Sequence, residues 1–293
     1  MEIGVTVPQL EIGPDSASIR DFATTAEELG FEHLLAADHV LGANADREGG
    51  WSGPYDHTDQ FHEPLTLFGF LSGITDRISL ATGILILPQR QTALVAKQAA
   101  EVDRLSDGRL RLGVAVGWNP IEFVGLGQPF DERGRRLEEQ IELLRKLWTE
   151  NPTQFDGSYH EIPDAGINPL PVQQPIPIWM GGTADVVLRR VARYADGWIP
   201  QRRPGNGLRE QLETIEAHAD DVGRNPDEIG LHGRIALEAL DDDTVIERLD
   251  AWNEVDADYV SIHTGGQGYN VAEHVEAIET VASNLDAAGM LEG

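Results

Sequence analysis

The dipeptide Asp38-His39 is the first place in this chain where residue type and position together suggest catalysis. It follows the apolar run 33–37, which reads as a buried β-strand. Histidine is the usual general acid or base near neutral pH. The alternative is an aspartate that caps local backbone beside a histidine that faces solvent. We predict that His39 is catalytic.

The segment Gly181-Gly182-Thr183 is a second candidate. It follows the strand-like run 176–180 and opens a helical pattern. Glycines let a ligand approach the backbone, and free N–H groups at a helix N-terminus bind anions. The alternative is a tight turn in which Thr183 caps the helix. The segment matches neither the P-loop nor the dinucleotide-binding glycine motif, so phosphate binding is a hypothesis.

Short apolar runs alternate with amphipathic segments along the whole chain, and they predict strands and helices respectively. The expected strands are 3–7, 33–37, 78–82, 110–116, 176–180, 197–199, 229–235 and 259–263. The expected helices are 16–29, 64–74, 92–105, 131–148, 184–194, 208–222, 244–252 and 271–288. Eight strand–helix units without a linker predict one α/β domain over residues 1–293, closed as a (β/α)₈ TIM barrel.

Two connections are too long for simple turns. Residues 40–63 follow the second expected strand, and residues 151–175 precede the fifth. Barrel active sites are built at the carboxyl ends of strands, so the first insertion lies at the functional face. We expect Trp51 and Tyr55 within it to form apolar walls of a substrate site. We expect that the second insertion can fold back over the barrel.

The same rule brings the ends of the third and fourth strands to that face. These residues are Thr82, Gly83, Ile84, Gly117, Trp118 and Asn119. Histidines and carboxylates also occur in the first insertion, but without the regular spacing of a metal site. They are His57, Asp59, His62 and Glu63, and we predict no metal.

The charge balance excludes some partners. The chain has 22 Lys+Arg against 50 Asp+Glu, a formal net charge of −28, which disfavours nucleic acid and anionic membranes. It has no cysteine, so disulfides, thiolate metal sites and thiol nucleophiles are excluded. With no apolar span or basic leader, a cytoplasmic protein is the default expectation. The acidity fits a salt-loving organism, and the alternative is an ordinary acidic protein.

Several short segments, in order and spacing, resemble the bacterial luciferase-like monooxygenase superfamily, and within it the coenzyme F420-dependent oxidoreductases. The resemblance covers essentially the whole chain. The segments are Ile3-Gly4-Val5, 26–31 leading to 37–39, 77–84, 107–109 running into 112–118, 130–133 and 177–182.

The resemblance implies a barrel that binds coenzyme F420, a deazaflavin, or FMN at the strand carboxyl ends. It places Asp38, Gly117 and Asn119 near the cofactor ring and residues 181–183 near its phosphate. It implies a cis peptide at Gly83–Ile84, and His39 matches a proposed acid/base of similar sugar-phosphate dehydrogenases. Where those enzymes have a carboxylate after the fourth strand, this chain reads Val-Gly-Trp-Asn at 116–119, which argues against sugar-phosphate chemistry.

The function expected from the resemblance is hydride transfer between coenzyme F420 and an unidentified small organic substrate. The alternative is an FMN-dependent monooxygenase that uses O2 and a separate flavin reductase. A cofactor carrier without turnover is a further reading. The resemblance also implies a homodimer. The polyanionic tail of F420 would need local cations, and the candidates are Arg90, Arg133, Arg202 and Arg203.

Overall fold

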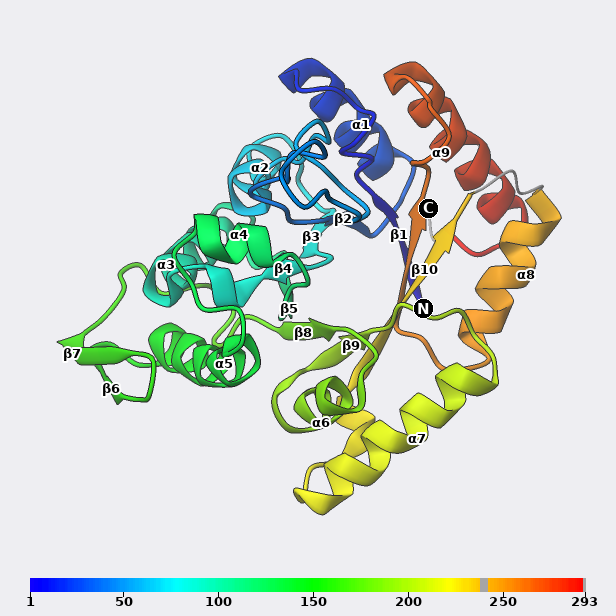
Figure 1. The fold of residues 1–293 in the computed structure, drawn as a ribbon. Coiled ribbons are helices and arrows are strands. Elements are labelled where there is room, and N and C mark those ends of the chain that lie inside the picture. Colours follow the sequence, from blue (N-terminus) through cyan, green and yellow to red (C-terminus); the bar gives the residue numbers. More distant parts are fainter. Residues whose placement is uncertain (238–241, 292–293) are drawn as a thin grey trace.

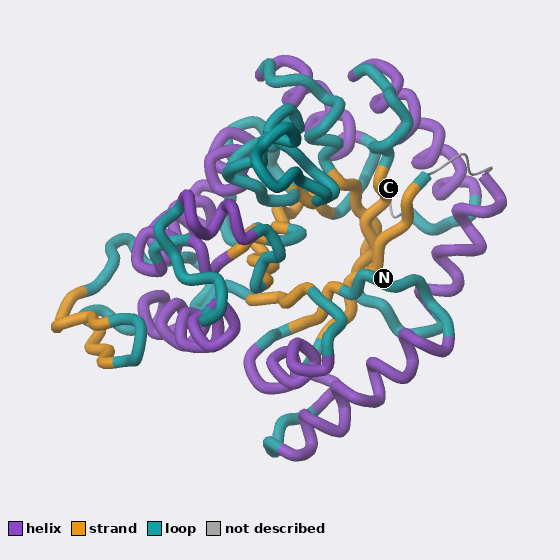
Figure 2. The backbone as a smooth tube through the Cα atoms, viewed as in Figure 1, coloured by secondary structure: helices purple, strands orange, loops and turns teal. Residues whose placement is uncertain are grey.

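The computed structural model describes residues 1–237 and 242–291, and within them it shows a closed parallel barrel surrounded by helices (Figures 1 and 2). The barrel order is β3-β2-β1-β11-β10-β9-β8-β5-β4, and an additional β3–β5 pairing closes the ring. The strands are β1 (Glu2–Thr6), β2 (His33–Ala36), β3 (Ser79–Thr82), β4 (Leu85–Ile86), β5 (Leu110–Ala115), β8 (Ile178–Gly181), β9 (Gly197–Ile199), β10 (Gly230–Ala236) and β11 (Tyr259–His263). The short β3 and β4 flank the Gly83–Ile84 bond and together form the third expected strand, so the TIM-barrel prediction is confirmed.

The helices form the outer layer because each buries one apolar face. In α1, for example, the side chains of Ile19, Phe22 and Ala26 are buried at helical spacing, and Asp15 caps the N-terminus by accepting from Ser18 N–H. The helices are α1 (Ser16–Glu28), α2 (Pro64–Ser72), α3 (Thr92–Leu105), α4 (Pro120–Gly125), α5 (Arg133–Thr149), α6 (Asp185–Tyr194), α7 (Asn206–Asp221), α8 (Asp242–Asn253) and α9 (Val271–Ala287). None of the described helices is long and apolar enough to cross a membrane.

Helix α4 is absent from the sequence-based expectation, which starts its next helix at residue 131. The local signal for it is present: Asn119 accepts a hydrogen bond from Ile121 N–H at 3.0 Å, and Pro120 occupies the first turn. The helix has six residues, too few to show an amphipathic period.

The two insertions take different positions relative to the barrel. Residues 40–63 pack over the carboxyl ends of the strands (Figure 1). Residues 151–175 contain the antiparallel hairpin of β6 (Thr153–Asp156) and β7 (Glu161–Ala165), which projects outside the barrel beside α5. His160 anchors it, with Nδ1 2.7 Å from Glu139 on α5 and Nε2 2.7 Å from Thr92 on α3. The expectation that this insertion can fold back over the barrel is wrong: none of its residues lines the cavity, and the His160 contacts hold the hairpin against the outer sides of α3 and α5.

The amino end of the barrel interior is closed by buried polar side chains. Ser261 Oγ on β11 lies 2.7 Å from His33 Nε2 and 2.8 Å from His232 Nε2. The Arg111 guanidinium lies 3.5 Å from the centre of the Tyr259 ring, a cation–π contact. This layer fills the barrel from below, so a ligand reaches the interior from the opposite end.

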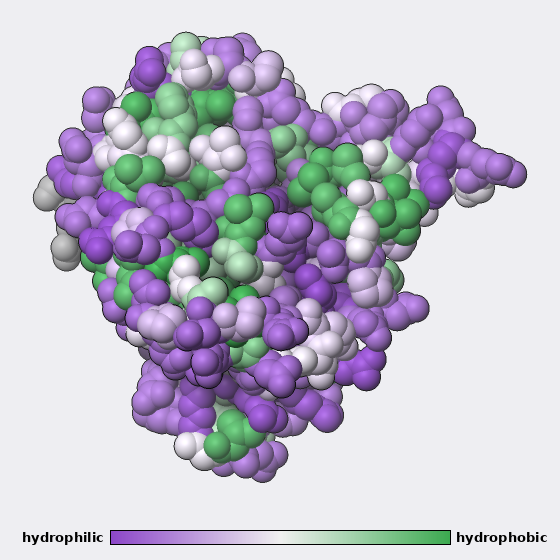
Figure 3. Space-filling view, turned by 90° about the vertical axis from the view of Figure 1, so that its left-hand side faces the viewer, coloured by the Kyte–Doolittle hydropathy of each residue, from purple (hydrophilic) through white to green (hydrophobic). Residues whose placement is uncertain are grey.

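The surface is largely hydrophilic. Figure 3 shows one side of the molecule as mostly polar side chains with separate, small hydrophobic patches. Ion pairs between residues one turn apart on the same helix are exposed, such as Lys146–Glu150 and Arg189–Asp185. Such pairs contribute little stability, so the excess of carboxylates is left to solvent and counter-ions.

Candidate functional site

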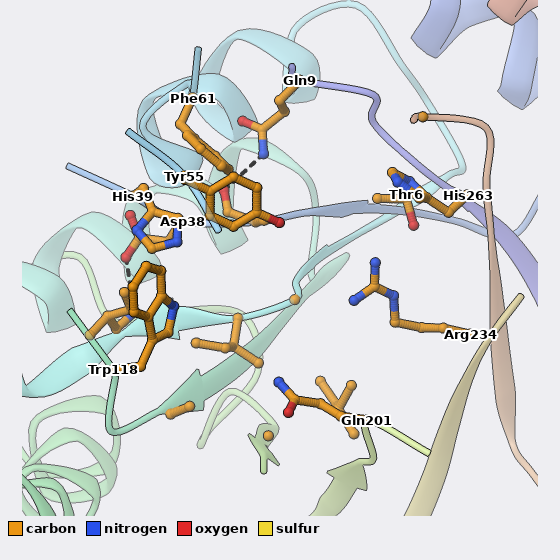
Figure 4. A pocket seen from close by; sticks show the side chains of 18 of the residues that line it. Thr6, Gln9, Asp38, His39, Tyr55, Phe61, Trp118, Gln201, Arg234 and His263 are labelled. Carbon is orange, nitrogen blue, oxygen red and sulfur yellow. Dashed lines mark hydrogen bonds between the residues drawn. The ribbon is translucent and has the colours of Figure 1, made fainter. Parts of the chain in front are cut away.

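A cavity of about 490 Å³ opens at the carboxyl end of the barrel (Figure 4). Its wall is formed by residues of the first insertion and by the carboxyl ends of seven strands, which are β1, β2, β5, β8, β9, β10 and β11. The lining is mainly apolar, with a few polar groups that converge on the centre, which is the composition of a small-molecule site.

His39 and Glu122 form a hydrogen-bonded pair on one wall. His39 Nδ1 is 3.0 Å from Glu122 Oε2, and the Glu122 side chain is fully buried. Burial alone would raise the pKa of Glu122. The hydrogen bonds from His39 and from the backbone N–H groups of Val40 and Leu41 outweigh it, and the pKa is lowered. The carboxylate is therefore charged and fixes the proton of His39 on Nδ1, which leaves Nε2 for a ligand.

Sequence reasoning noted Glu122 near the fourth strand but gave it no place. The structure brings it to His39 because α4 starts at Pro120, directly after β5, and turns its first residues toward the segment after β2. Asn119 supports this turn by capping α4 and by donating to Leu41 O at 3.4 Å. The available signal was the helix start Asn119-Pro120 with an acidic residue in its first turn.

Aromatic rings surround His39. The ring centres of Tyr55, Phe61 and Trp118 lie 5.2, 4.8 and 5.5 Å from the histidine ring. Tyr55 lines the cavity, as expected for a substrate wall. Trp51 lies one layer away: it stacks on Trp118 at 5.8 Å and donates to Tyr55 O. The cluster shields the His39–Glu122 pair from bulk water.

Asp38 is engaged by the protein itself. Its Oδ2 accepts from Ile86 N–H at 2.9 Å, and its Oδ1 accepts from the Arg90 guanidinium at 2.7 Å. Burial raises the pKa of Asp38, while Arg90 opposes this. Arg90 also contacts Glu63 at 2.8 Å, so its charge is committed within the fold. Asp38 thus holds β4 and the residues around the Gly83–Ile84 bond in place beside the cavity.

A glycine-rich wall faces the His39 side of the cavity. The Gly83–Ile84 peptide is cis, as the resemblance implies. Gly117 has φ +76°, and a Cβ there would lie 2.5 Å from Ile86 Cγ2. A Cβ at Gly181 would lie 3.0 Å from Ile84 Cγ2, and Gly182 has φ +123°. All of these glycines line the cavity with backbone, and at each one a Cβ would press on a neighbouring side chain. We call Gly83, Gly117, Gly181 and Gly182 the glycine cradle.

The cradle continues into the N-terminus of α6. The N-cap residue is Ala184, which makes no side-chain cap, so Thr183 does not cap this helix. Thr183 instead accepts from Gln211 through its carbonyl at 2.9 Å. The uncapped first turn retains N–H donors that a phosphate needs. The cradle and this turn fit a ring with a phosphate-bearing side chain, the common feature of FMN and F420.

Of the other predicted residues, Trp118 lines the cavity, whereas Thr82 and Arg133 do not. Thr82 is buried, and its Oγ1 donates to Gly113 O at 2.6 Å across the β3–β5 junction. Trp118 lines the cavity and is 40% exposed. Arg133 spans Phe130 by a cation–π contact at 3.7 Å. Among the described residues there is no group of histidines and carboxylates that could hold a metal ion.

Three residues that sequence reasoning missed complete the opposite wall: Thr6, Arg234 and His263 (Figure 4). Each lies at or near the carboxyl end of its strand. The strand-end rule pointed to them, but nothing in their local sequence separates them from other strand residues.

Comparisons with known proteins identify the family. The family model of the luciferase-like monooxygenases matches residues 1–289. An uncharacterised protein of Mycobacterium tuberculosis is 40% identical over 157 residues, 54% of this chain and 52% of that protein. The FMNH2-dependent dimethylsulfone monooxygenase of Pseudomonas putida is 31% identical over 205 residues, 68% of this chain and 53% of that enzyme. The chain thus spans about half the length of these two relatives.

Other matches include F420-dependent proteins. The F420-dependent glucose-6-phosphate dehydrogenase of Amycolatopsis mediterranei is 31% identical over 239 residues, 76% of this chain and 67% of that enzyme. The structure of the F420-dependent tetrahydromethanopterin reductase of Methanopyrus kandleri superposes with a TM-score of 0.74 at 17% identity, covering 97% of each chain, and shares the fold. With a family model matched over nearly its full length, this chain belongs to the luciferase-like monooxygenases, a family of oxidoreductases.

Proposed function

We propose that this protein transfers hydride between coenzyme F420 and a small organic substrate, with His39 as the acid/base. The observation that carries the proposal is the His39–Glu122 pair, whose free Nε2 shares one cavity with the glycine cradle. A proton-transfer group and a bare backbone wall in the same cavity are what such a reaction requires.

The chain's own residues account for binding and proton movement. Gly83, Gly117, Gly181 and Gly182 would hold the ring, and the first turn of α6 would hold the phosphate. A bound deazaflavin supplies a carbon that accepts or donates hydride. As an alcohol carbon loses hydride, His39 Nε2 takes the hydroxyl proton, and the negative Glu122 stabilises the resulting imidazolium. In the reverse direction the same nitrogen returns the proton to a carbonyl oxygen.

The preference for F420 rests on the surface near the cavity mouth. Arg202 and Arg203 are exposed directly after Gln201, which lines the cavity, and neither forms an ion pair with the rest of the described chain. On a chain of net charge −28, two adjacent free cations there suit a polyanionic tail. The alternative, an FMN-dependent monooxygenase with a separate reductase, is favoured by the similarity to the dimethylsulfone enzyme.

Direct titration distinguishes the two. The purified protein would be titrated in molar KCl with F420 and with FMN, with binding followed by fluorescence. We expect F420 to bind at least tenfold more tightly than FMN. The Arg202→Gln/Arg203→Gln double variant should weaken F420 binding and leave FMN binding unchanged, because FMN lacks the polyanionic tail.

The opposite preference would replace the proposal with the monooxygenase, and the search would turn to O2-dependent reactions with a reductase. Failure of both cofactors to bind would overturn both functions. Arg135→Gln is the matched control, since Arg135 is 73% exposed, lies outside the cavity lining and contacts only the surface residue Glu132 among the described residues.

A further inference from the structure

The cavity wall opposite His39 carries polar groups that the proposed reaction does not use. Thr6 ends β1, and its register partner on β11 is His263. His263 in turn pairs with Ala236 on β10, two residues beyond Arg234. The three side chains therefore stand on adjacent strands, and Figure 4 shows them facing the cavity from one side.

None of the three has a partner within the described protein. Thr6 Oγ1 and His263 Nδ1 are buried without a hydrogen bond, and the Thr6 residue is only 5% exposed. The Arg234 side chain lines the cavity, is exposed to solvent within it, and makes no hydrogen bond or ion pair with described residues. Leaving the buried Thr6 hydroxyl and the buried His263 Nδ1 unpaired costs folding free energy, so the fold itself gains nothing from these two polar groups. Convergent, unpaired donors are the mark of a ligand subsite.

The subsite carries a single positive charge. Burial and the neighbouring Arg234 lower the pKa of His263 to about 4, so this ring is neutral at pH 7. Desolvation by the surrounding cavity walls also lowers the pKa of Arg234, but a guanidinium remains protonated. Glu11 is the carboxylate near His263, and its charge is already engaged by the N–H groups of Gly266 and Gly268 and by His274 at 3.2 Å.

We propose that Arg234, Thr6 and His263 bind the carboxylate of the substrate. One guanidinium matches a monoanion with its two oxygens, whereas a phosphate dianion would leave a charge uncompensated. The rest of the cavity offers apolar contacts from Tyr55, Phe61 and Ile86. The substrate class is therefore a small organic acid with an apolar body, whose reacting hydroxyl or carbonyl group lies toward His39. This assignment of the substrate rests on the proposed function, while the carboxylate subsite itself does not.

The test uses benzoate and its neutral isostere benzamide as probes. Calorimetric titrations of the full chain at constant KCl concentration would compare the two ligands. We expect wild type to prefer benzoate by about tenfold or more, the worth of a charged hydrogen-bonded contact. Arg234→Met should abolish the preference, and Arg234→Lys should retain part of it. The surface variant Arg135→Gln makes the same charge change and should behave as wild type.

Two further readouts guard against a trivial loss of fold. The thermal midpoint of ligand-free Arg234→Met should stay close to that of wild type, because this exposed side chain makes no hydrogen bond or ion pair with described residues; a clear decrease would mean that Arg234 is structural and would overturn the proposal. Thr6→Val keeps the side-chain shape and should reduce the benzoate preference several-fold without the amide affinity changing.

The acceptor that Arg234 binds could also come from the cofactor, as an oxygen of its ring, instead of from a substrate carboxylate. The FMN and F420 titrations would therefore be repeated with Arg234→Met. Weaker cofactor binding with an intact benzoate preference would assign the subsite to the cofactor and overturn the substrate assignment. The absence of any preference in wild type would overturn the subsite. A wild type that prefers benzoate but binds neither cofactor would sink the proposed function and leave the subsite standing.

Discussion

His39 Nδ1 lies 3.0 Å from Glu122 Oε2, although 83 residues separate the two in the chain. The carboxylate also accepts from Val40 N–H at 2.7 Å and from Leu41 N–H at 3.2 Å, so it orders the backbone that carries the histidine. This arrangement fixes one ring nitrogen and exposes the other to the cavity. It makes the roles of the two residues separable by mutation.

Replacing His39 by Ala should lower kcat by about 100-fold or more, the usual worth of a positioned acid/base, with cofactor affinity nearly retained. Glu122→Gln should lower kcat by less, because the histidine stays in place but loses the stabilising charge. Steady-state kinetics and cofactor titration on the same preparations would measure both. An unchanged kcat in His39→Ala would remove this residue from the mechanism and favour a carrier without turnover.

Asp38→Ala should destabilise the protein by about 3 kcal/mol, because it leaves the buried Ile86 N–H unpaired and removes one of the two carboxylates that pair with Arg90. Asp38→Asn should cost less, since an amide oxygen can still accept from Ile86 N–H. Urea unfolding would give both values. A stable Asp38→Ala protein with lost cofactor affinity would instead make Asp38 a direct ligand contact.

Gly182→Val should weaken cofactor binding at least tenfold by covering the bare backbone of the cradle. It should also cost about 1–3 kcal/mol of stability, because φ is +123° there. Gly223→Val is the matched control: it has φ +70°, open space around it and no place in the cavity lining. Equal cofactor affinity in folded Gly182→Val and wild type would remove this residue from the cofactor site.

Acid should destabilise the protein below about pH 6.5 because of the buried histidines at the amino end of the barrel interior. Burial lowers the pKa values of His33 and His232 well below 6.5 in the folded state. Below pH 6.5 the unfolded chain therefore binds protons that the folded chain does not, and stability falls with pH. His263, with a pKa of about 4, adds to these two histidines, and the three groups predict a loss of about 3–4 kcal/mol per pH unit near pH 5.5.

Urea titrations at pH 7.5, 6.5 and 5.5 would measure this slope. Buried or hydrogen-bonded carboxylates with lowered pKa values, such as Glu27 and Glu139, titrate below this window. His232→Gln should reduce the slope. Stability that does not change over this range would contradict the assignment of neutral buried histidines.

The net charge of −28 predicts that thermal stability rises from low to molar KCl, since salt screens repulsion among the excess carboxylates. Thermal scans across KCl concentrations would test this. A midpoint that stays flat or falls would refute the hypothesis that the acidic surface is an adaptation to high salt.

The sequence by itself determined the local properties of the chain. Apolar runs and helical periods predicted the barrel, and Asp38-His39 and Gly181-Gly182 were located at strand ends from their neighbours alone. Such signals are readable because burial on both faces of a strand and on one face of a helix imposes a short period on the sequence.

Only the tertiary structure decided which distant residues meet. It paired Glu122 with His39, committed Asp38 to Arg90, and directed residues 151–175 away from the cavity. It also brought Thr6, Arg234 and His263 together. These residues lie on strands from both ends of the chain and are neighbours only because the sheet closes. The count of strand–helix units predicted a closed ring, but the side chains that meet inside it depend on the strand register and packing of the whole barrel, which no local pattern records.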